Sequence, residues 1–108
     1  MDHRLFFSAT QSNKIFIGDV LSKILLKKGI VLEIGSGSGE HGVEFQKRFP
    51  EIIWQTSDPK MEYRKSISSW IDSINPCHHH PLPQALCLSL CSWSRLQYLN
   101  IIEMTIFR

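Results

Sequence analysis

The sequence has few cysteines and no long apolar run, and both absences narrow the class of protein. Three cysteines occur in 108 residues, all late in the chain and in no C-x-x-C pair. We therefore expect free, mostly buried thiols rather than a disulfide framework or a zinc site. The apolar stretch at residues 5–7 is too short for a secretory signal, and no run approaches membrane-spanning length. A cytoplasmic protein without a membrane partner is expected.

An excess of charge of one sign is also missing. The sequence has twelve Lys and Arg and ten Asp and Glu, which gives a formal net charge of +2. The basic pairs at residues 27–28 and 47–48 are mixed with acids. This pattern indicates a solvated surface and no clear nucleic-acid interface. The histidine run that follows Cys77 has no second ligand pair at a fixed spacing, so no metal site is expected.

The most informative segment is an apolar run that ends in an acid and passes into alternating glycines. Residues 30–34 predict a parallel strand buried on both faces. Gly35, Gly37 and Gly39 permit positive φ and let backbone N–H groups approach a ligand closely. Residues 40–49 predict a short helix, stopped by Pro50, whose first amides face the same ligand. The segment therefore favours a nucleotide-type cofactor.

Helical and strand patterns flank this segment. A helix is predicted from Thr10 or Ser12 to about Lys28, with Gly29 at its C-terminal cap. Residues 52–57 predict a second strand, parallel to the first because the links are short. A third helix is predicted over residues 60–75. The apolar faces predicted to pack inward are Ile17, Val20, Leu21, Ile24 and Leu25 in the first helix, and Met61, Ile67, Trp70, Ile71 and Ile74 in the third.

The tail of the chain differs in character from the rest. Residues 73–108 hold one of the ten acids and two of the twelve bases. The alternation of Leu86, Leu88 and Leu90 suits a strand, whereas Leu86, Leu90 and Trp93 suit a helix, so both interpretations stay open. A last strand is predicted over residues 101–107. We divide the chain into residues 1–75 and a divergent tail, 76–108. The loss of charge in the tail indicates a truncated or frame-shifted reading frame.

Three ligand-binding elements are predicted at the carboxyl ends of neighbouring strands: Glu33, the glycine turn and Asp58. Asp58 lies nineteen residues past Gly39, a spacing at which a carboxylate accepts hydrogen bonds from both ribose hydroxyls. The alternative for Asp58 is a turn or helix-cap role before Pro59. Residues 37–42 also match the dinucleotide pattern G-x-G-x-x-G. The triphosphate-binding loop is excluded, because no Lys-Ser or Lys-Thr follows the glycines.

At this point the chain resembles the class I S-adenosylmethionine-dependent methyltransferases, whose first motif E-x-G-x-G-x-G is matched over residues 33–39. A small methyltransferase-like family of unassigned substrate is closer still. The matching segments are Asn13-Lys14, Leu32-Glu33-Ile34, Gly39-Glu40-His41, Trp54-Gln55 and Ser57-Asp58-Pro59. The resemblance spans residues 1 to about 75 and implies an α/β, Rossmann-like three-layer sandwich, truncated after the first two or three strands.

The resemblance also implies a cofactor, S-adenosyl-L-methionine, and the residues that bind it. The turn formed by Gly35, Ser36, Gly37 and Gly39 is expected to hold the methionyl part, and Asp58 the ribose; Asn13 and His41 are expected to line the same pocket. Glu33 suits the ammonium and sulfonium groups by charge. The methyl acceptor is unknown, and catalysis by this chain alone is doubtful.

Members of that family are longer, and their second half supplies further strands. Without those strands one edge of the first strand is unpaired, and we expect marginal stability or self-association unless the tail folds back to cover that edge. Two other functions stay open: a dinucleotide (NAD)-binding Rossmann fragment of an oxidoreductase, and a non-catalytic binding or interaction module.

Overall fold

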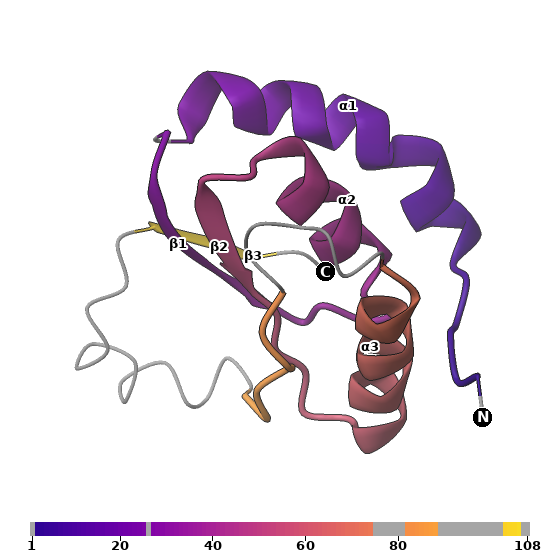
Figure 1. The fold of residues 1–108 in the computed structure, drawn as a ribbon. Coiled ribbons are helices and arrows are strands. Elements are labelled where there is room, and N and C mark those ends of the chain that lie inside the picture. The colour runs from indigo at the N-terminus through magenta and orange to yellow at the C-terminus, as the bar shows by residue number, and fades with distance from the viewer. Residues whose placement is uncertain (1, 26, 75–81, 89–102, 107–108) are drawn as a thin grey trace.

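The computed structural model describes residues 2–25, 27–74, 82–88 and 103–106, and it has an alternating α/β architecture (Figure 1). The elements in chain order are α1 (Ser8–Ile24), β1 (Gly29–Ile34), α2 (Glu40–Arg48), β2 (Ile52–Gln55), α3 (Met61–Ser73) and β3 (Glu103–Ile106). Among the described helices, none combines the length and the apolar character needed to cross a bilayer.

β1 lies at the centre of a three-stranded sheet of order β2-β1-β3. It pairs in parallel with β2, Val31 opposite Trp54, and in parallel with β3, Val31 opposite Glu103. The predicted parallel β-α-β unit is therefore confirmed, and β3 falls within the predicted last strand. The edge of β1 is not left unpaired, because β3 supplies the hydrogen-bonding partner on that side; this is the alternative in which the tail folds back to cover the edge.

The expectation of self-association rested on that open edge. With both sides of β1 paired, the sheet offers no such site at its central strand. Size-exclusion chromatography with light scattering over a range of protein concentrations measures the association directly. A monomer throughout is the result that the paired edge favours, and a concentration-dependent dimer would point to another surface.

A fourth position in the sheet is occupied by a single parallel bridge between Ser57 and Leu86. The Leu86 N–H donates to Thr56 O (3.1 Å), and the Asp58 N–H donates to Leu86 O (2.9 Å). Residues 82–88 therefore run beside the end of β2, on the side away from β1. If residues 82–88 are counted as the third strand and β3 as the fourth, the order is that of a doubly wound sheet, 3-2-1-4. In such sheets, ligands bind outside the carboxyl ends of the strands, at the point beside the first strand where the strand order reverses.

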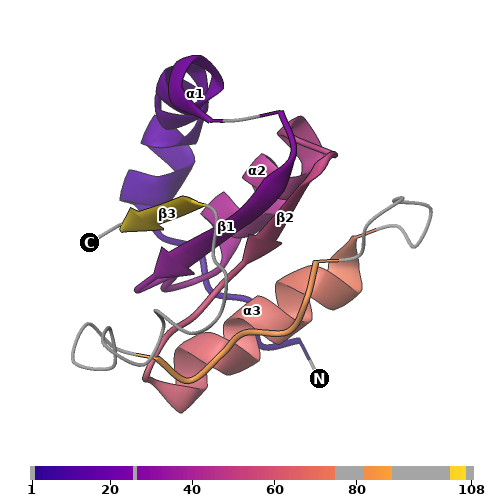
Figure 2. The same ribbon diagram turned by 90° about the vertical axis from the view of Figure 1, so that its left-hand side faces the viewer.

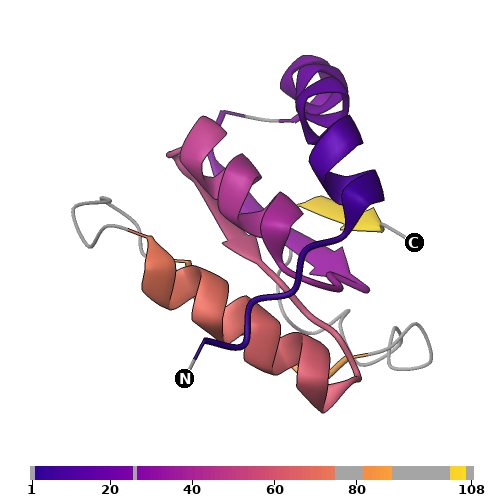
Figure 3. The ribbon, with the colours of Figure 1, turned by 90° about the vertical axis from the view of Figure 1, so that its right-hand side faces the viewer.

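The helices cover one face of the sheet, which Figure 3 views from the helical side and Figure 2 from the opposite side. One apolar cluster joins β1 and β2 to α1 and α2, and Ile71 of α3 packs against it. Its buried members are Leu21, Val31, Phe45, Ile52, Trp54 and Leu82. On the other face, Leu88 is the described residue that packs against Leu32 and Ile34. The second helical layer of the expected three-layer sandwich is not among the described residues.

α1 is shifted toward the N-terminus relative to its prediction. It begins at Ser8 and ends at Ile24, so Lys28 lies outside it, and Gly29 opens β1 rather than capping the helix. Val20 and Ile24 are 43% and 62% exposed. Ile17 and Leu21 of the helix, with Leu25 at its C-cap, form the narrower stripe that packs on the core, and this leaves two of the five predicted inward positions in solvent.

α3 also differs from its predicted apolar face. Ile67 is fully buried and Ile71 packs against the core, as expected. Met61, the first residue of the helix, is 62% exposed. Trp70 does not face the sheet: its ring packs against Phe6, with ring centroids 5.2 Å apart. The N-terminal residues lie against Ser66, Ser69 and Trp70, and this turns Trp70 away from the core while Ile67 and Ile71 still face it.

The described part of the tail is extended. Leu86 pairs with Ser57 in strand fashion, which favours the strand interpretation over residues 82–88. Leu90 and Trp93, on which the helix interpretation depends, and the histidine run at 78–80 lie outside the described residues. Cys87 is free and exposed rather than buried.

Candidate cofactor-binding site

The glycine turn follows β1 directly and requires its glycines. Gly35, Gly37 and Gly39 have φ angles of 73°, 60° and 95°. Gly39 is the N-cap of α2, and a Cβ there would lie 2.8 Å from Ile67 Cγ1 and 3.0 Å from Ile67 Cα. Both the backbone angle and the close approach of α3 therefore exclude a side chain at Gly39. The turn leads straight into α2, so the first amides of this helix lie beside it.

Hydrogen bonds tie the turn to the end of β2. The Ser36 N–H donates to Ser57 O and the Ser57 N–H donates to Ser36 Oγ, both at 2.9 Å. The Ser57 hydroxyl in turn donates to Glu33 O at 2.6 Å. Ser57, fully buried, was not predicted as a site residue. The signal available was its place beside Asp58 in the segment Ser57-Asp58-Pro59.

Asp58 meets the glycine turn from the neighbouring strand. Its Oδ2 accepts the Gly37 N–H at 3.0 Å, and its Oδ1 accepts the Lys60 N–H at 2.9 Å. The second bond is the turn role that was kept as an alternative, and the ligand-binding role of Asp58 stays a prediction. Arg64 supports this turn, because its Nη1 donates to Asp58 O (2.9 Å) and Pro59 O (2.8 Å). Arg64 was not predicted from the sequence.

Glu33 is fully buried at the end of β1. Neither oxygen of its carboxyl has a hydrogen-bond partner among the residues that the structure describes. The pKa of Glu33 is raised to about 7, chiefly by burial; the Ser36 hydroxyl and the Trp54 indole lower it without forming a hydrogen bond, and the nearby charge of Asp58 adds a smaller rise. Buried carboxyl groups normally have partners. Glu33 therefore has the capacity to accept hydrogen bonds from a bound molecule or to balance a positive charge on it.

Two residues of the neighbouring segment share this property, one on β2 and one directly after it. Trp54 Nε1 and Thr56 Oγ1 are buried and unpartnered within the described part of the chain. The pairing of Val31 with Trp54 puts Glu33 level with Thr56 on the same face of the sheet. α2 covers this row closely, since a Cβ on Gly42 would lie 2.7 Å from Thr56 Cγ2. A row of unpartnered polar atoms thus lies under the first turns of α2, next to the glycine turn.

The structure also brings Asn13 and His41 together. His41 Nε2 lies 3.2 Å from Asn13 Oδ1, joining the first turn of α2 to α1. The imidazole stacks on Phe45, with ring centroids 5.2 Å apart and planes 10° apart. Burial lowers the pKa of His41, so the neutral ring is favoured. That this pair lines a cofactor pocket stays a prediction.

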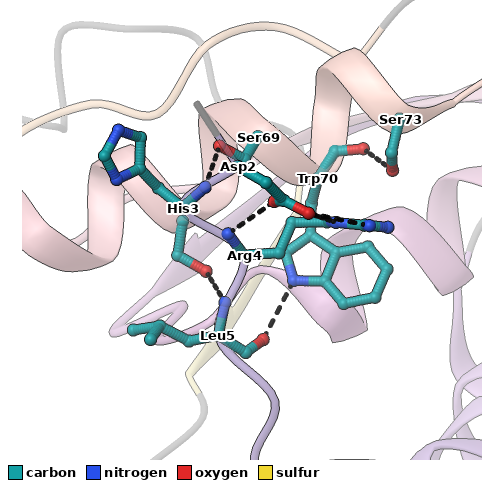
Figure 4. A network of polar contacts seen from close by, with 8 residues as sticks. Asp2, His3, Arg4, Leu5, Ser69, Trp70 and Ser73 are labelled. Atoms are coloured by element: carbon teal, nitrogen blue, oxygen red, sulfur yellow. Dashed lines mark hydrogen bonds and ion pairs between the residues drawn. The ribbon is translucent and has the colours of Figure 1, made fainter.

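The N-terminal strap, residues 2–7, contacts α3 and the glycine turn, and the sequence did not predict these contacts. Figure 4 shows how it lies along α3: the His3 N–H donates to Ser69 Oγ (3.0 Å) and the Trp70 indole N–H donates to Leu5 O (3.1 Å). The Leu5 N–H donates to Ser66 Oγ (2.9 Å), and the same hydroxyl donates to Ser38 O in the glycine turn (2.7 Å). Nothing in the local pattern signals a contact with residues more than sixty positions away.

Fold and turn together define the class: a partial Rossmann-like α/β domain with a glycine turn at the tip of its central strand. A model of the family described as "Protein of unknown function (DUF938)" matches residues 4–102. The chain belongs to this methyltransferase-like family. The match runs past residue 75, further than the resemblance seen in the sequence. The division of the chain at residues 75–76 stays a prediction.

Proposed function

We propose that this chain is the cofactor-binding part of an S-adenosylmethionine-dependent methyltransferase. The observation that carries the proposal is the buried Glu33 carboxyl, unpartnered among the described residues and adjoining a glycine turn on which Asp58 converges. S-adenosylmethionine has an ammonium and a sulfonium for carboxylates, a carboxylate for amides at a helix start, and a ribose diol for Asp58. Each of these groups has a chemically matching partner on this chain.

The residues have distinct roles in this proposal. The turn amides and the start of α2 hold the carboxylate end of the methionyl group, and Glu33 balances its positive charge. Asp58 accepts hydrogen bonds from the ribose with lone pairs that the two backbone N–H groups leave unused. The bound cofactor supplies an activated methyl group on a sulfonium. The protein then needs to align an acceptor and exclude water, without a covalent nucleophile of its own.

The NAD-binding alternative has one supporting observation and one against it. Gly42 sits where the third glycine of G-x-G-x-x-G allows close packing of helix and strand, and its approach to Thr56 fits that role. A dinucleotide, however, would place a pyrophosphate at the glycine turn, close to both Glu33 and Asp58. Since S-adenosylmethionine has no phosphate and is positively charged at the sulfur, the Glu33 carboxyl favours it, whereas Asp58 suits the ribose of either compound.

Calorimetric titration of the purified chain tests the proposal. We expect S-adenosylmethionine and S-adenosylhomocysteine to bind and NAD not to bind. The reverse preference would establish the dinucleotide alternative. Binding of the methyl donor without methyl transfer to any acceptor in a cell extract would support the non-catalytic module. Failure to bind any of the three compounds would refute the proposal.

Asp58→Asn provides a residue-level prediction. The amide keeps the shape of the side chain but loses its charge and one acceptor atom, and a hydrogen bond to a charged group contributes roughly 1.5–3 kcal/mol. We expect the affinity for both nucleosides to fall about 10- to 100-fold. Asp72→Asn, an exposed substitution on α3, is the matched control and is expected to leave binding unchanged. Equal affinity of Asp58→Asn and the wild-type chain, with a normal thermal melt, would exclude Asp58 as the ribose partner.

A further inference from the structure

Four polar atoms are buried without a partner at one place in the fold, on the helix-covered face of the sheet. They are the two carboxyl oxygens of Glu33, the Trp54 indole Nε1 and the Thr56 hydroxyl, and none has a hydrogen-bond partner among the residues that the structure describes. All three side chains are fully buried. Buried polar groups are normally paired, because an unpaired one costs free energy. Three such side chains together indicate a state of the protein in which they pair with one another.

The backbone puts these side chains on one face of two neighbouring segments. β1 and β2 are parallel with Val31 opposite Trp54, so Glu33 and Thr56, two residues further on, are level and on the same face. Neighbouring strands lie about 4.8 Å apart, within reach of a side chain. A Cβ on Gly42 of α2 would lie 2.7 Å from Thr56 Cγ2 and 3.5 Å from Trp54 Nε1. The indole N–H and the threonine therefore lie together under the first turns of α2, next to the acid.

The three groups are chemically complementary. An indole N–H only donates, a hydroxyl can donate, and an ionised carboxylate only accepts, through two oxygens. The row thus holds two donors and an acceptor with one oxygen for each. The indole already lowers the pKa of Glu33 without forming a hydrogen bond. When Glu33 loses its proton, small rotations of the side chains pair all four atoms, and hydrogen bonds to a charged group are roughly twice as strong as those between neutral groups.

The other titratable groups near this row are engaged elsewhere. Asp58, which follows β2, accepts two backbone N–H groups. Glu40, the first residue of α2, accepts the Phe7 N–H of the strap and a hydroxyl of the glycine turn. Burial lowers the pKa of His41, so its neutral ring is favoured. Within the described part of the chain, the donors that remain for the Glu33 carboxylate are the two in its own row.

We propose that Trp54 and Thr56 are positioning residues that hold Glu33 in its ionised form, each by donating one hydrogen bond to the carboxylate. This inference rests on the proposed function, in which the ionised carboxylate balances the positive charge of the cofactor, and deepens it. The two donors lower the cost of ionising a buried acid and fix the orientation of its oxygens. Without one of them, a larger share of Glu33 stays protonated at a given pH and does not bind the cofactor.

Calorimetric titration of Thr56→Val with S-adenosylmethionine at pH 6 and pH 8.5 tests the threonine. Valine keeps the shape of the side chain but has no hydroxyl. At pH 6, below the Glu33 pKa of about 7, we expect binding about tenfold weaker than in the wild-type chain, because the acid loses a proton less readily. At pH 8.5, where the acid is ionised in both chains, the difference should shrink to about twofold or less. Ionisation of the ligand itself cancels from the ratio of the two chains.

Two further variants accompany this titration. Thr56→Ser returns the hydroxyl and should restore the wild-type affinity at pH 6. Ser22→Ala, which removes an exposed hydroxyl from α1, is the matched control and should equal the wild-type chain at both pH values. A purely structural role of Thr56 would instead weaken binding by the same factor at pH 6 and pH 8.5.

The indole proton of Trp54 tests the second donor in the free wild-type chain. In NMR spectra of the ¹⁵N-labelled protein between pH 5 and 9, this resonance should move downfield with a midpoint near pH 7, since an N–H that donates to a carboxylate is deshielded. Substitution of the other two tryptophans in turn assigns the signal. Glu33→Gln should abolish the movement. The Trp70 indole, which donates to Leu5 O, is the internal control and should not follow the titration.

The inference requires both results. A stationary Trp54 resonance in the wild-type chain would overturn it, and so would a Thr56→Val affinity that is unchanged or equally reduced at the two pH values. The NMR titration uses the wild-type chain, so it stays decisive even if Thr56→Val does not fold. These outcomes differ from failure of the proposed function, in which the wild-type chain binds no cofactor while the Trp54 resonance still titrates.

Discussion

Glu33→Gln is expected to stabilise the folded chain above neutral pH and to abolish tight cofactor binding. The pKa of Glu33 is raised from 4.5 to about 7 in the folded state, chiefly by burial. Below pH 4.5 both the folded and the unfolded chain hold the proton, and ionisation costs nothing. Between pH 4.5 and 7 the unfolded chain loses it first, so the wild-type free energy of unfolding falls with rising pH. Glutamine does not ionise and escapes this loss.

The expected size of the effect follows from the separation of the two pKa values. The free energy of unfolding of Glu33→Gln should exceed that of the wild type by about 3 kcal/mol at pH 8, where Glu33 is ionised in both states. At pH 4.5 the difference should be almost nothing. Urea unfolding of wild type and Glu33→Gln, followed by circular dichroism at pH 4.5, 6, 7 and 8, measures it. The exposed Glu51→Gln serves as control and should show no growing difference. Parallel stability curves for Glu33→Gln and wild type would contradict the raised pKa.

The same substitution has the opposite effect on binding. If Glu33 balances the positive charge of S-adenosylmethionine, the bound state requires the ionised carboxylate. The affinity of the wild-type chain should therefore rise between pH 6 and 8, with release of a proton on binding that calorimetry in buffers of different ionisation enthalpy detects. Glu33→Gln should bind weakly and without this pH dependence. A residue that is destabilising when ionised, yet needed in that form for binding, is characteristic of functional sites.

Gly39→Ala is expected to cause the largest loss of stability among substitutions in the turn. Its φ of 95° is strained for any residue with a side chain, and the added methyl would meet Ile67 on its backbone as well as its side chain. Strain and overpacking each cost about 1–3 kcal/mol, so we expect a loss of about 3 kcal/mol or more. The contact between α2 and α3 at Gly39 should loosen with it.

Gly37→Ala is the matched control in the same turn. Its φ of 60° lies in the left-handed region that other residues occasionally adopt at about 1–2 kcal/mol, and its new methyl meets a ring of the strap rather than backbone. Urea unfolding of the two variants under identical conditions should therefore show a smaller loss for Gly37→Ala. Equal losses would mean that the approach of Ile67 to Gly39 contributes little.

Much of the fold was predictable because its central unit is local in sequence. The apolar run before Gly35, the short helix before Pro50 and the second strand all appear with boundaries close to those predicted. Their parallel pairing followed from short links, and so did the meeting of Asp58 with the turn. Each of these inferences depends on residues within about one supersecondary unit, where hydrophobic period and turn chemistry decide the structure.

Predictions failed where a helix face had several potential partners. The spacing in α1 and α3 identified a broad apolar side but not what would cover it. In α1 only one stripe reaches α2, and in α3 the strap takes Trp70 away from the sheet. β3 was predicted as a strand, but its pairing with β1 depends on a contact across some seventy residues that no local pattern records.

By itself, the amino-acid sequence determined the order of the elements, the glycine turn and the two acids at the strand tips, because backbone conformation and periodicity act over a few residues. Only the tertiary structure decided that Glu33 is buried without a partner among the described residues and that the strap brings Phe7 onto Gly37. Burial and long-range hydrogen bonds are properties of the packed chain. They set the pKa of an acid and the surface that a ligand meets, and neither can be read from the neighbours of a residue in the sequence.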